Sequence, residues 1–299
     1  VRSIAAAPFA PLSLFDGDTA DTLLGAPVFY APCVAGYVGG DVTAGLLASG
    51  LCRKPGQHLF LDLGTNGEMA LGGAEGFSCC AVASGPAFEG AGIACGMPAL
   101  DGAVSRVRYD RGFLYDVIGA SEPRGICGSG LVDLAAALLD LGAIDKSGRL
   151  LPPEETPPPL RRFVRPDGRG NGVFHLTDRV YLTAEDVRSL QLAKAAVAGG
   201  IEVLLRQREL DAAALDGVYI AGGFGSYIDP DSAMAIGMLP QLPRSKLRCL
   251  GNTALAGASM AALDGEERCR LGRIAASCRY IELSGRQDFA RAFTDHMVF

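Results

Sequence analysis

Leu59-Phe60-Leu61-Asp62-Leu63-Gly64-Thr65-Asn66-Gly67-Glu68 is the stretch that decides the fold. It predicts a strand with apolar residues on both sides of Asp62, as in a strand that is covered on both faces of its sheet. An ionised carboxylate is costly there, but it is tolerated at a strand end where it coordinates, through water, a magnesium ion held by nucleotide phosphates. Gly64 and Gly67 would let backbone N–H groups approach phosphate oxygens, and Thr65 adds a hydroxyl donor. A hairpin turn whose acid caps its own backbone explains the same residues, so the motif alone leaves both interpretations open.

The composition predicts a globular chain. Its 299 residues are 49% hydrophobic and 20% charged, which is enough for one large domain or two lobes. A net charge of −6 without a Lys/Arg run argues against a nucleic-acid surface. Acids interrupt the apolar stretch 131–144, so we expect no membrane span. Nine scattered cysteines and no leader peptide favour a cytoplasmic protein with reduced thiols, without an iron–sulfur cluster or zinc site built within this chain. Because the chain starts without a methionine, we expect a fragment.

The hydrophobic pattern predicts an α/β fold. Strands are expected at 59–63, 68–71, 77–82, 104–109, 113–118, 218–221, 247–250 and 280–283. Helices are expected at 36–47, 125–141 and 253–263, near the C-terminus, and from Thr183 onward, where Asp186 completes a capping box. The proline-rich stretch 151–172 predicts a surface excursion.

A second candidate site follows the strand at 218–221. Gly222, Gly223, Phe224 and Gly225 form a Gly-Gly-x-Gly turn, whose backbone would be flat enough for an adenine ring and ribose. A tight turn between elements is the alternative. Gln191 and Lys194, on the helix before this strand, are candidates to hydrogen-bond ribose or adenine, and a solvated helix edge is the other interpretation of this pair.

The order of these motifs resembles the superfamily of acetate and sugar kinases, heat-shock chaperones and actin. The resemblance implies a ribonuclease-H-like, actin-like ATPase core with a mixed sheet flanked by helices, and nucleotide held between two lobes. Residues 36–47 look like the first connecting helix, 62–68 like the second phosphate loop, 221–225 like the adenosine loop and 251–262 like the second connecting helix. The first phosphate loop and most of the first lobe are expected to be missing.

Several blocks together resemble one family, the reductive activators of corrinoid proteins, in their C-terminal ATPase domain. These blocks are AAPFAPL (6–12), DLGTNGE (62–68), SGPAFEGAGIACGM (84–97), GICGSGLVD (125–133), LQLAKAAVAGGI (190–201), AGGFGSYID (221–229), GNTALAGA (251–258) and RYIELSGRQDFARAF (279–293). The resemblance implies that 1–58 is a connecting segment and helix, 59–250 the nucleotide-binding lobe, and 251–299 the second connecting helix with C-terminal elements. Full-length members carry a [2Fe–2S] domain, which we expect to be absent here.

The resemblance also implies a function and roles for single residues. Members use ATP and Mg²⁺ to return a corrinoid methyl-carrier protein from inactive Co(II) to Co(I). Asp62 would position magnesium or the attacking water, while Gly64, Thr65, Asn66 and Gly67 would hold phosphate. Gly222, Gly223, Phe224 and Gly225 would receive adenosine, with Gln191 and Lys194 beside them. Glu89, or else Glu68, would orient water.

Three other functions remain open from the sequence. The chain would be a small-molecule kinase of the same superfamily if it had a substrate pocket with a carboxylate base and both phosphate loops. It would be a non-catalytic docking lobe for a corrinoid protein if another segment completes the ATPase. An activase of the radical-dehydratase type would need a [4Fe–4S] cluster between subunits, and no cysteine pairing clearly supports one. A two-fold homodimer is an ordinary expectation for any of these.

Overall fold

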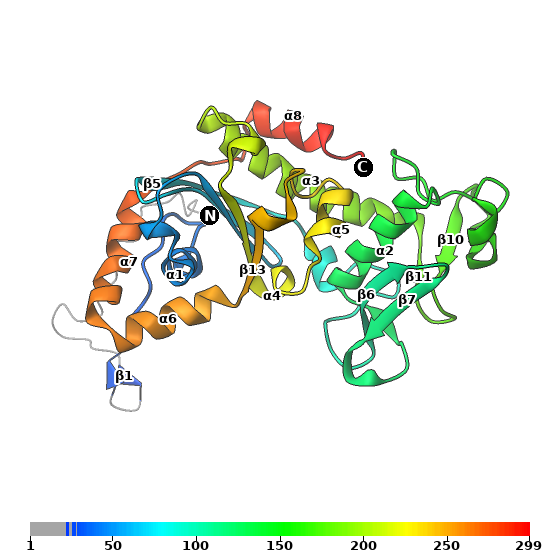
Figure 1. The fold of residues 1–299 in the computed structure, drawn as a ribbon, viewed down its shortest axis with the longest axis horizontal. Coiled ribbons are helices and arrows are strands. Elements are labelled where there is room, and N and C mark those ends of the chain that lie inside the picture. The colour runs from blue at the N-terminus through cyan, green and yellow to red at the C-terminus, as the bar shows by residue number, and fades with distance from the viewer. Residues whose placement is uncertain (1–21, 24–25, 28) are drawn as a thin grey trace, which may run out of the picture.

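A six-stranded mixed sheet forms the centre of the computed structural model, which describes residues 22–23, 26–27 and 29–299 (Figure 1). The strand order is β13-β12-β3-β4-β5-β14. The bounds are β3 His58–Leu63, β4 Gly67–Gly73, β5 Gly76–Val82, β12 Gly217–Ala221, β13 Leu247–Gly251 and β14 Cys278–Tyr280. β12 is parallel to β3 and β13, β4 is antiparallel to β3 and β5, and β14 is parallel to β5. The predicted mixed sheet is therefore confirmed.

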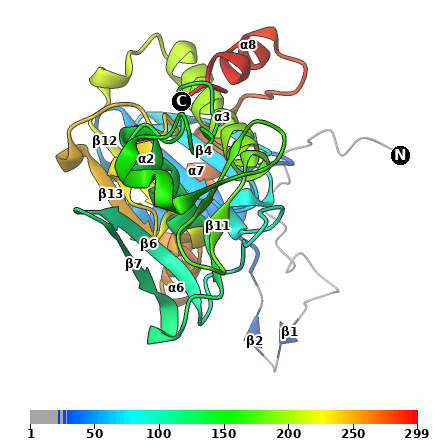
Figure 2. The ribbon, with the colours of Figure 1, turned by 90° about the vertical axis from the view of Figure 1, so that its right-hand side faces the viewer.

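Helices cover both faces of this sheet. α3 (Ala184–Gln207) and α8 (Gln287–Asp295) lie on one face, and α1 (Gly40–Ser49), α6 (Thr253–Leu263) and α7 (Gly265–Ser277) lie on the other (Figures 1 and 2). Successive side chains of a strand point to opposite faces. Leu59, Leu61 and Leu63 of β3 accordingly join one buried cluster, and Phe60 joins the other, beside α1. The same alternation directs Asp62 toward the α1 face.

A second group of elements is inserted between β5 and α3 and lies on the right in Figure 1. It comprises β6 (Ala103–Tyr109), β7 (Phe113–Val117), β8 (Gly125–Ile126), α2 (Gly128–Asp140), β9 (Val164–Pro166), β10 (Gly172–His175) and β11 (Tyr181–Leu182). The proline-rich stretch is more than a surface excursion, because it contains β9 and the buried Leu160.

The remaining elements are short. They are β1 (Thr22–Leu23), β2 (Ala26–Pro27), α4 (Gly222–Gly225), α5 (Pro230–Ala235) and the 3₁₀ turns η1 (Leu51–Arg53), η2 (Pro86–Glu89), η3 (Ile118–Ala120), η4 (Pro158–Phe163), η5 (Ala212–Ala214) and η6 (Arg244–Lys246). The block at 6–12 that entered the family resemblance lies outside the described residues. No helix in the described part of the chain is long and apolar enough to cross a membrane.

Local signals explain where the predictions succeed and fail. The capping box at Thr183 and Asp186 is confirmed, and both of its hydrogen bonds are made. The helix predicted from residue 36 begins only at Gly40, because Val34 N–H donates to Val38 O over 2.9 Å and closes a turn first. The strand predicted at 280–283 ends at Tyr280, and α7 was not predicted at all.

Candidate functional site

The two glycine-rich motifs meet at the ends of adjacent strands. Asp62 is the penultimate residue of β3, and it lies opposite Ala221 of β12 on one side and Glu68 of β4 on the other. Gly222 follows at a φ of +94°, and a Cβ there would lie 2.5 Å from Asp62 Oδ1 and 2.5 Å from Leu63 O. Only glycine allows this backbone to turn so close to the carboxylate. The fold thus joins the phosphate turn (Gly64–Gly67) to the adenosine turn (Gly222–Gly225) through Asp62.

The charge of Asp41 acts on two carboxyl groups at this point. Burial, and then the charge of Asp41, raise the pKa of Asp62 from 3.8 to about 6. Burial, and then the charges of Asp41 and Asp62, raise the pKa of Glu68 from 4.5 to about 7. Asp41 lies in the first turn of α1, where an acid is favourable. The role of Asp41 was not predicted, although an acid directly after Gly39-Gly40 at a helix start is a signal in the sequence.

The phosphate turn offers fewer free donors than predicted. Gly64 N–H donates to Asn66 O over 2.9 Å, and Gly67 pairs with Leu63 as the first residue of β4. Thr65 and Asn66 are exposed, and their amide groups have no acceptor among the described residues. These two amides and the two side chains are the groups that the turn presents to a ligand.

Glu89 lies against the phosphate turn. Thr65 Oγ1 donates a hydrogen bond to the exposed carboxylate of Glu89 in η2, and Ser84 Oγ donates to Thr65 O over 3.1 Å. The predicted water-orienting acid is therefore adjacent to the predicted phosphate-binding residue, although 24 positions separate them in sequence.

The adenosine turn is half open and half buried. Gly223 is exposed, and a Cβ there would meet nothing within 4 Å, so its backbone is accessible. Phe224 is buried, and its ring stacks on that of Phe88 with the centroids 4.4 Å apart and an angle of 9° between the planes. Gly225 is also buried, and a Cβ there would approach Ile220 Cγ2 to 2.9 Å. The face available to a ligand is formed by Gly222 and Gly223.

Gln191 and Lys194 are occupied within the chain. Both are buried, at 3% and 1% exposure, so the solvated helix edge is wrong. Gln191 donates to Ser147 O over 2.8 Å. Lys194 donates to Val298 O, and its ammonium lies 5.3 Å from the centroid of the Phe299 ring. Contact with ribose or adenine would require both side chains to leave these partners.

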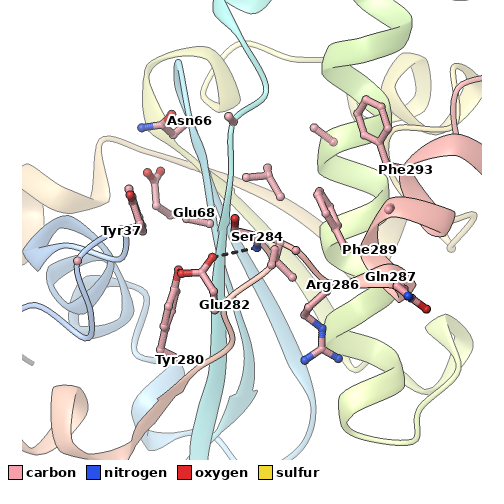
Figure 3. Close-up of a pocket in the computed structure, with 18 of the residues that line it drawn as sticks. Tyr37, Asn66, Glu68, Tyr280, Glu282, Ser284, Arg286, Gln287, Phe289 and Phe293 are labelled. Atoms are coloured by element: carbon pink, nitrogen blue, oxygen red, sulfur yellow. Dashed lines mark hydrogen bonds between the residues drawn. The ribbon is translucent and has the colours of Figure 1, made fainter. Parts of the chain in front are cut away.

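A cavity of about 1110 Å³ borders the phosphate turn at Asn66. Figure 3 shows Asn66, Glu68 and Tyr37 on one wall and Phe289 and Phe293 of α8 on the other. Its lining includes none of the residues of the adenosine turn. The cavity is therefore a separate space that shares Glu68 with the carboxyl cluster.

Comparison with known proteins agrees with this arrangement. Residues 56–299 match the family model described as the C-terminal domain of RACo, the ASKHA domain. The chain belongs to this family. It is 35% identical over 282 residues to the corrinoid activation enzyme RamQ of Eubacterium limosum, covering 91% of this chain and 47% of that protein.

Two further proteins match. The [Co(II) methylated amine-specific corrinoid protein] reductase of Methanosarcina barkeri is 27% identical over 252 residues, covering 77% of this chain and 43% of that protein. A solved structure of a reductive activator for corrinoid, iron-sulfur protein superposes with a TM-score of 0.83 at 37% identity, covering 92% of this chain and 45% of that chain. The chain spans about half the length of the relatives it matches, and the predicted actin-like fold class is confirmed.

The carboxyl cluster of this RACo-type domain fits magnesium held through water better than a directly coordinated ion. Mg²⁺ prefers hard oxygen ligands and usually keeps several waters while one or two carboxylates and substrate phosphates hold it. Asp41 and Asp62 supply such oxygens. In the described part of the chain, no three His, Cys, Asp or Glu side chains are grouped closely enough to hold a metal by themselves. Asp62, with Asp41, is the group that would hold it.

Proposed function

We propose that this chain is the nucleotide-binding lobe of an ATP-dependent reductive activator that returns corrinoid proteins from Co(II) to Co(I). The observation that carries the proposal is the contact between Gly222 and Asp62, which joins the two glycine-rich turns beside three carboxyl groups. Membership of the RACo family and the printed names of the relatives support corrinoid proteins as partners.

Each part of the site has a distinct task in this proposal. Thr65 and Asn66 donate hydrogen bonds to phosphate oxygens, and the open backbone at Gly222 and Gly223 receives adenosine. Asp62 and Asp41 hold Mg²⁺ through water, and this ion supplies positive charge next to the phosphates. Glu68 has a pKa of about 7, which suits transient uptake of the proton that attacking water loses. Glu89 is the second candidate for orienting that water.

ATP can drive an uphill electron transfer only if it changes the complex between the activator and the corrinoid protein. Reduction of Co(II) to Co(I) takes one electron, which a [2Fe–2S] centre outside this chain would deliver. Nucleotide would favour one of two conformations of the activator–corrinoid complex, and so change the potential of cobalt or access to it. The proposal places this chemistry in the cytoplasm, with a homodimer as the working assembly.

Titration calorimetry with MgATP tests the proposal in the full-length natural protein. Saturable binding is expected, and Asp62→Ala should abolish hydrolysis while leaving the fold intact. Glu75→Gln is the matched control, because Glu75 is an exposed acid at the opposite end of the same sheet. Near-normal hydrolysis by Asp62→Ala would contradict the role of Asp62.

Two further measurements separate the other candidate functions. Transfer of labelled phosphate to a sugar or carboxylic acid would indicate a kinase. Binding to a corrinoid protein without any nucleotide binding would indicate a docking lobe.

A further inference from the structure

The short turn η2 contacts both ligand-binding turns and the start of α2. Glu89 accepts a hydrogen bond from Thr65 of the phosphate turn. The preceding residue, Phe88, stacks on Phe224 of the adenosine turn. The carbonyl of Phe88 also faces the first residue of α2, since a Cβ on Gly128 would lie 1.9 Å from Phe88 O. Phe88 and Glu89 therefore link the phosphate turn, the adenosine turn and α2, which are remote from one another in sequence.

The hydrogen bond from Thr65 to Glu89 competes directly with phosphate binding. A threonine hydroxyl has one proton to donate, and carboxylate and phosphate oxygens are both acceptors. If Thr65 donates to a phosphate, its bond to Glu89 is lost. The negative charges of phosphate and Glu89 also repel each other at this short range. A phosphate that accepts from Thr65 would therefore release Glu89 from this hydrogen bond.

We propose that Thr65 and Glu89 form a phosphate-sensitive latch, and that Phe88 is a positioning residue that transmits its release to the adenosine turn and α2. This inference rests on the proposed nucleotide site and adds a means of regulation to it. The stack of Phe88 on Phe224 is buried, at 3% and 8% exposure, so movement of one ring without the other would open a gap in the core. When Glu89 is released and Phe88 moves with it, the stacked ring of Phe224 must therefore move too.

Three backbone amides report whether η2 and the adenosine turn are closed. Gly90 N–H donates to Ala87 O over 3.0 Å and Ala91 N–H to Pro86 O over 3.1 Å, which closes η2. Tyr227 N–H donates to Phe224 O over 3.1 Å at the end of the adenosine turn. Hydrogen exchange at these three amides therefore measures the opening of η2 and the opening of the adenosine turn separately.

The experiment is hydrogen exchange of the full-length natural protein with and without magnesium tripolyphosphate, with binding measured by calorimetry on the same samples. Tripolyphosphate has no adenosine, so any effect on Tyr227 must come from the phosphate turn. We expect exchange at Gly90 and Ala91 to accelerate roughly three- to tenfold, as for the loss of one hydrogen bond. Exchange at Tyr227 should accelerate with them.

Variants separate the latch from a merely structural turn. In Thr65→Val, exchange at Gly90 and Ala91 should already be fast without tripolyphosphate. Adding tripolyphosphate should not change it further. Thr65→Ser should restore the wild-type response. Both changes are at an exposed position, so they do not threaten folding. Phe88→Leu should keep the response at Gly90 and Ala91 but lose it at Tyr227.

The outcomes distinguish failure of the latch from failure of the proposed function. Saturated calorimetric binding with unchanged exchange at Gly90 and Ala91 overturns the latch and leaves the nucleotide site intact. A response at Tyr227 that survives in Phe88→Leu overturns the role of Phe88. No binding of either MgATP or tripolyphosphate overturns the proposed function, and the latch with it.

Discussion

Replacing Asp62 with asparagine should make the ligand-free protein more stable while removing its ATPase activity. The pKa of Asp62 is raised from 3.8 to about 6, chiefly by burial. The folded state therefore binds the Asp62 proton more tightly than the unfolded chain does between about pH 4 and pH 6. Stability falls as pH rises through this window, and the loss is complete above it. Asparagine keeps the shape of the side chain and carries no charge to desolvate.

The size of the effect follows from the pKa. A rise from 3.8 to about 6 corresponds to about 3 kcal/mol at pH 8, and partial solvent access to Asp62 reduces this to about 2 kcal/mol. For a chain of this length, that gain raises Tm by about 4 °C. At pH 5 the gain should be about half as large, because the wild-type carboxyl is then mostly protonated in the folded state.

The assay is thermal unfolding of wild type, Asp62→Asn and the exposed control Glu75→Gln in EDTA at pH 5 and pH 8. Phosphate release is measured in parallel with MgATP in the full-length protein. A gain in Tm for Asp62→Asn that is equal at both pH values, or a loss of stability at pH 8, would refute the reasoning. An equal gain for Glu75→Gln would also refute it, because that residue lies outside the carboxyl cluster.

Three further substitutions test packing and burial. Gly222→Ala should lower stability by about 2–4 kcal/mol and prevent MgATP binding, because its Cβ would clash with the end of β3. The control Gly223→Ala should leave Tm nearly unchanged. Gly257→Ala should cost about 1–3 kcal/mol in urea unfolding, since its Cβ would lie 2.0 Å from Ala44 O where α6 crosses α1. Burial lowers the pKa of Lys194 from 10.5 to about 8. The stability of the wild type in urea unfolding should therefore rise between pH 8 and pH 10, and Lys194→Met should remove that rise. Loss of MgATP affinity in Lys194→Met, but not in a variant of Phe299, would favour its predicted contact with nucleotide.

Most of the central sheet was predictable because its signals are local. The apolar run at β3 and the capping box at Thr183 each act within a few residues. Glycine at 222 followed from the need for a tight turn after a buried strand, and its φ of +94° agrees with that reasoning. The phosphate and adenosine turns were recognisable for the same reason, although neither motif alone decided the function.

The rest of the site depends on contacts between distant residues, which no local pattern encodes. Asp41 acts on Asp62 only because α1 packs against the face to which Asp62 points. Lys194 resembled a solvated polar residue on an amphipathic helix, but Val298 and Phe299 cover it. The stack of Phe88 on Phe224 likewise joins two loops whose sequences give no sign of each other.

Two unusual features meet at one point of this fold. Burial, and then the charge of Asp41, raise the pKa values of Asp62 and Glu68, and the charge of Asp62 raises that of Glu68 further. Gly222 takes a backbone conformation that L side chains rarely adopt, directly against Asp62. Features that break local rules without a compensating contact are expected where a ligand supplies the compensation. A cation near Asp62 would offset the cost of burying the carboxylate charge, which is consistent with a ligand site beside the close turn at Gly222.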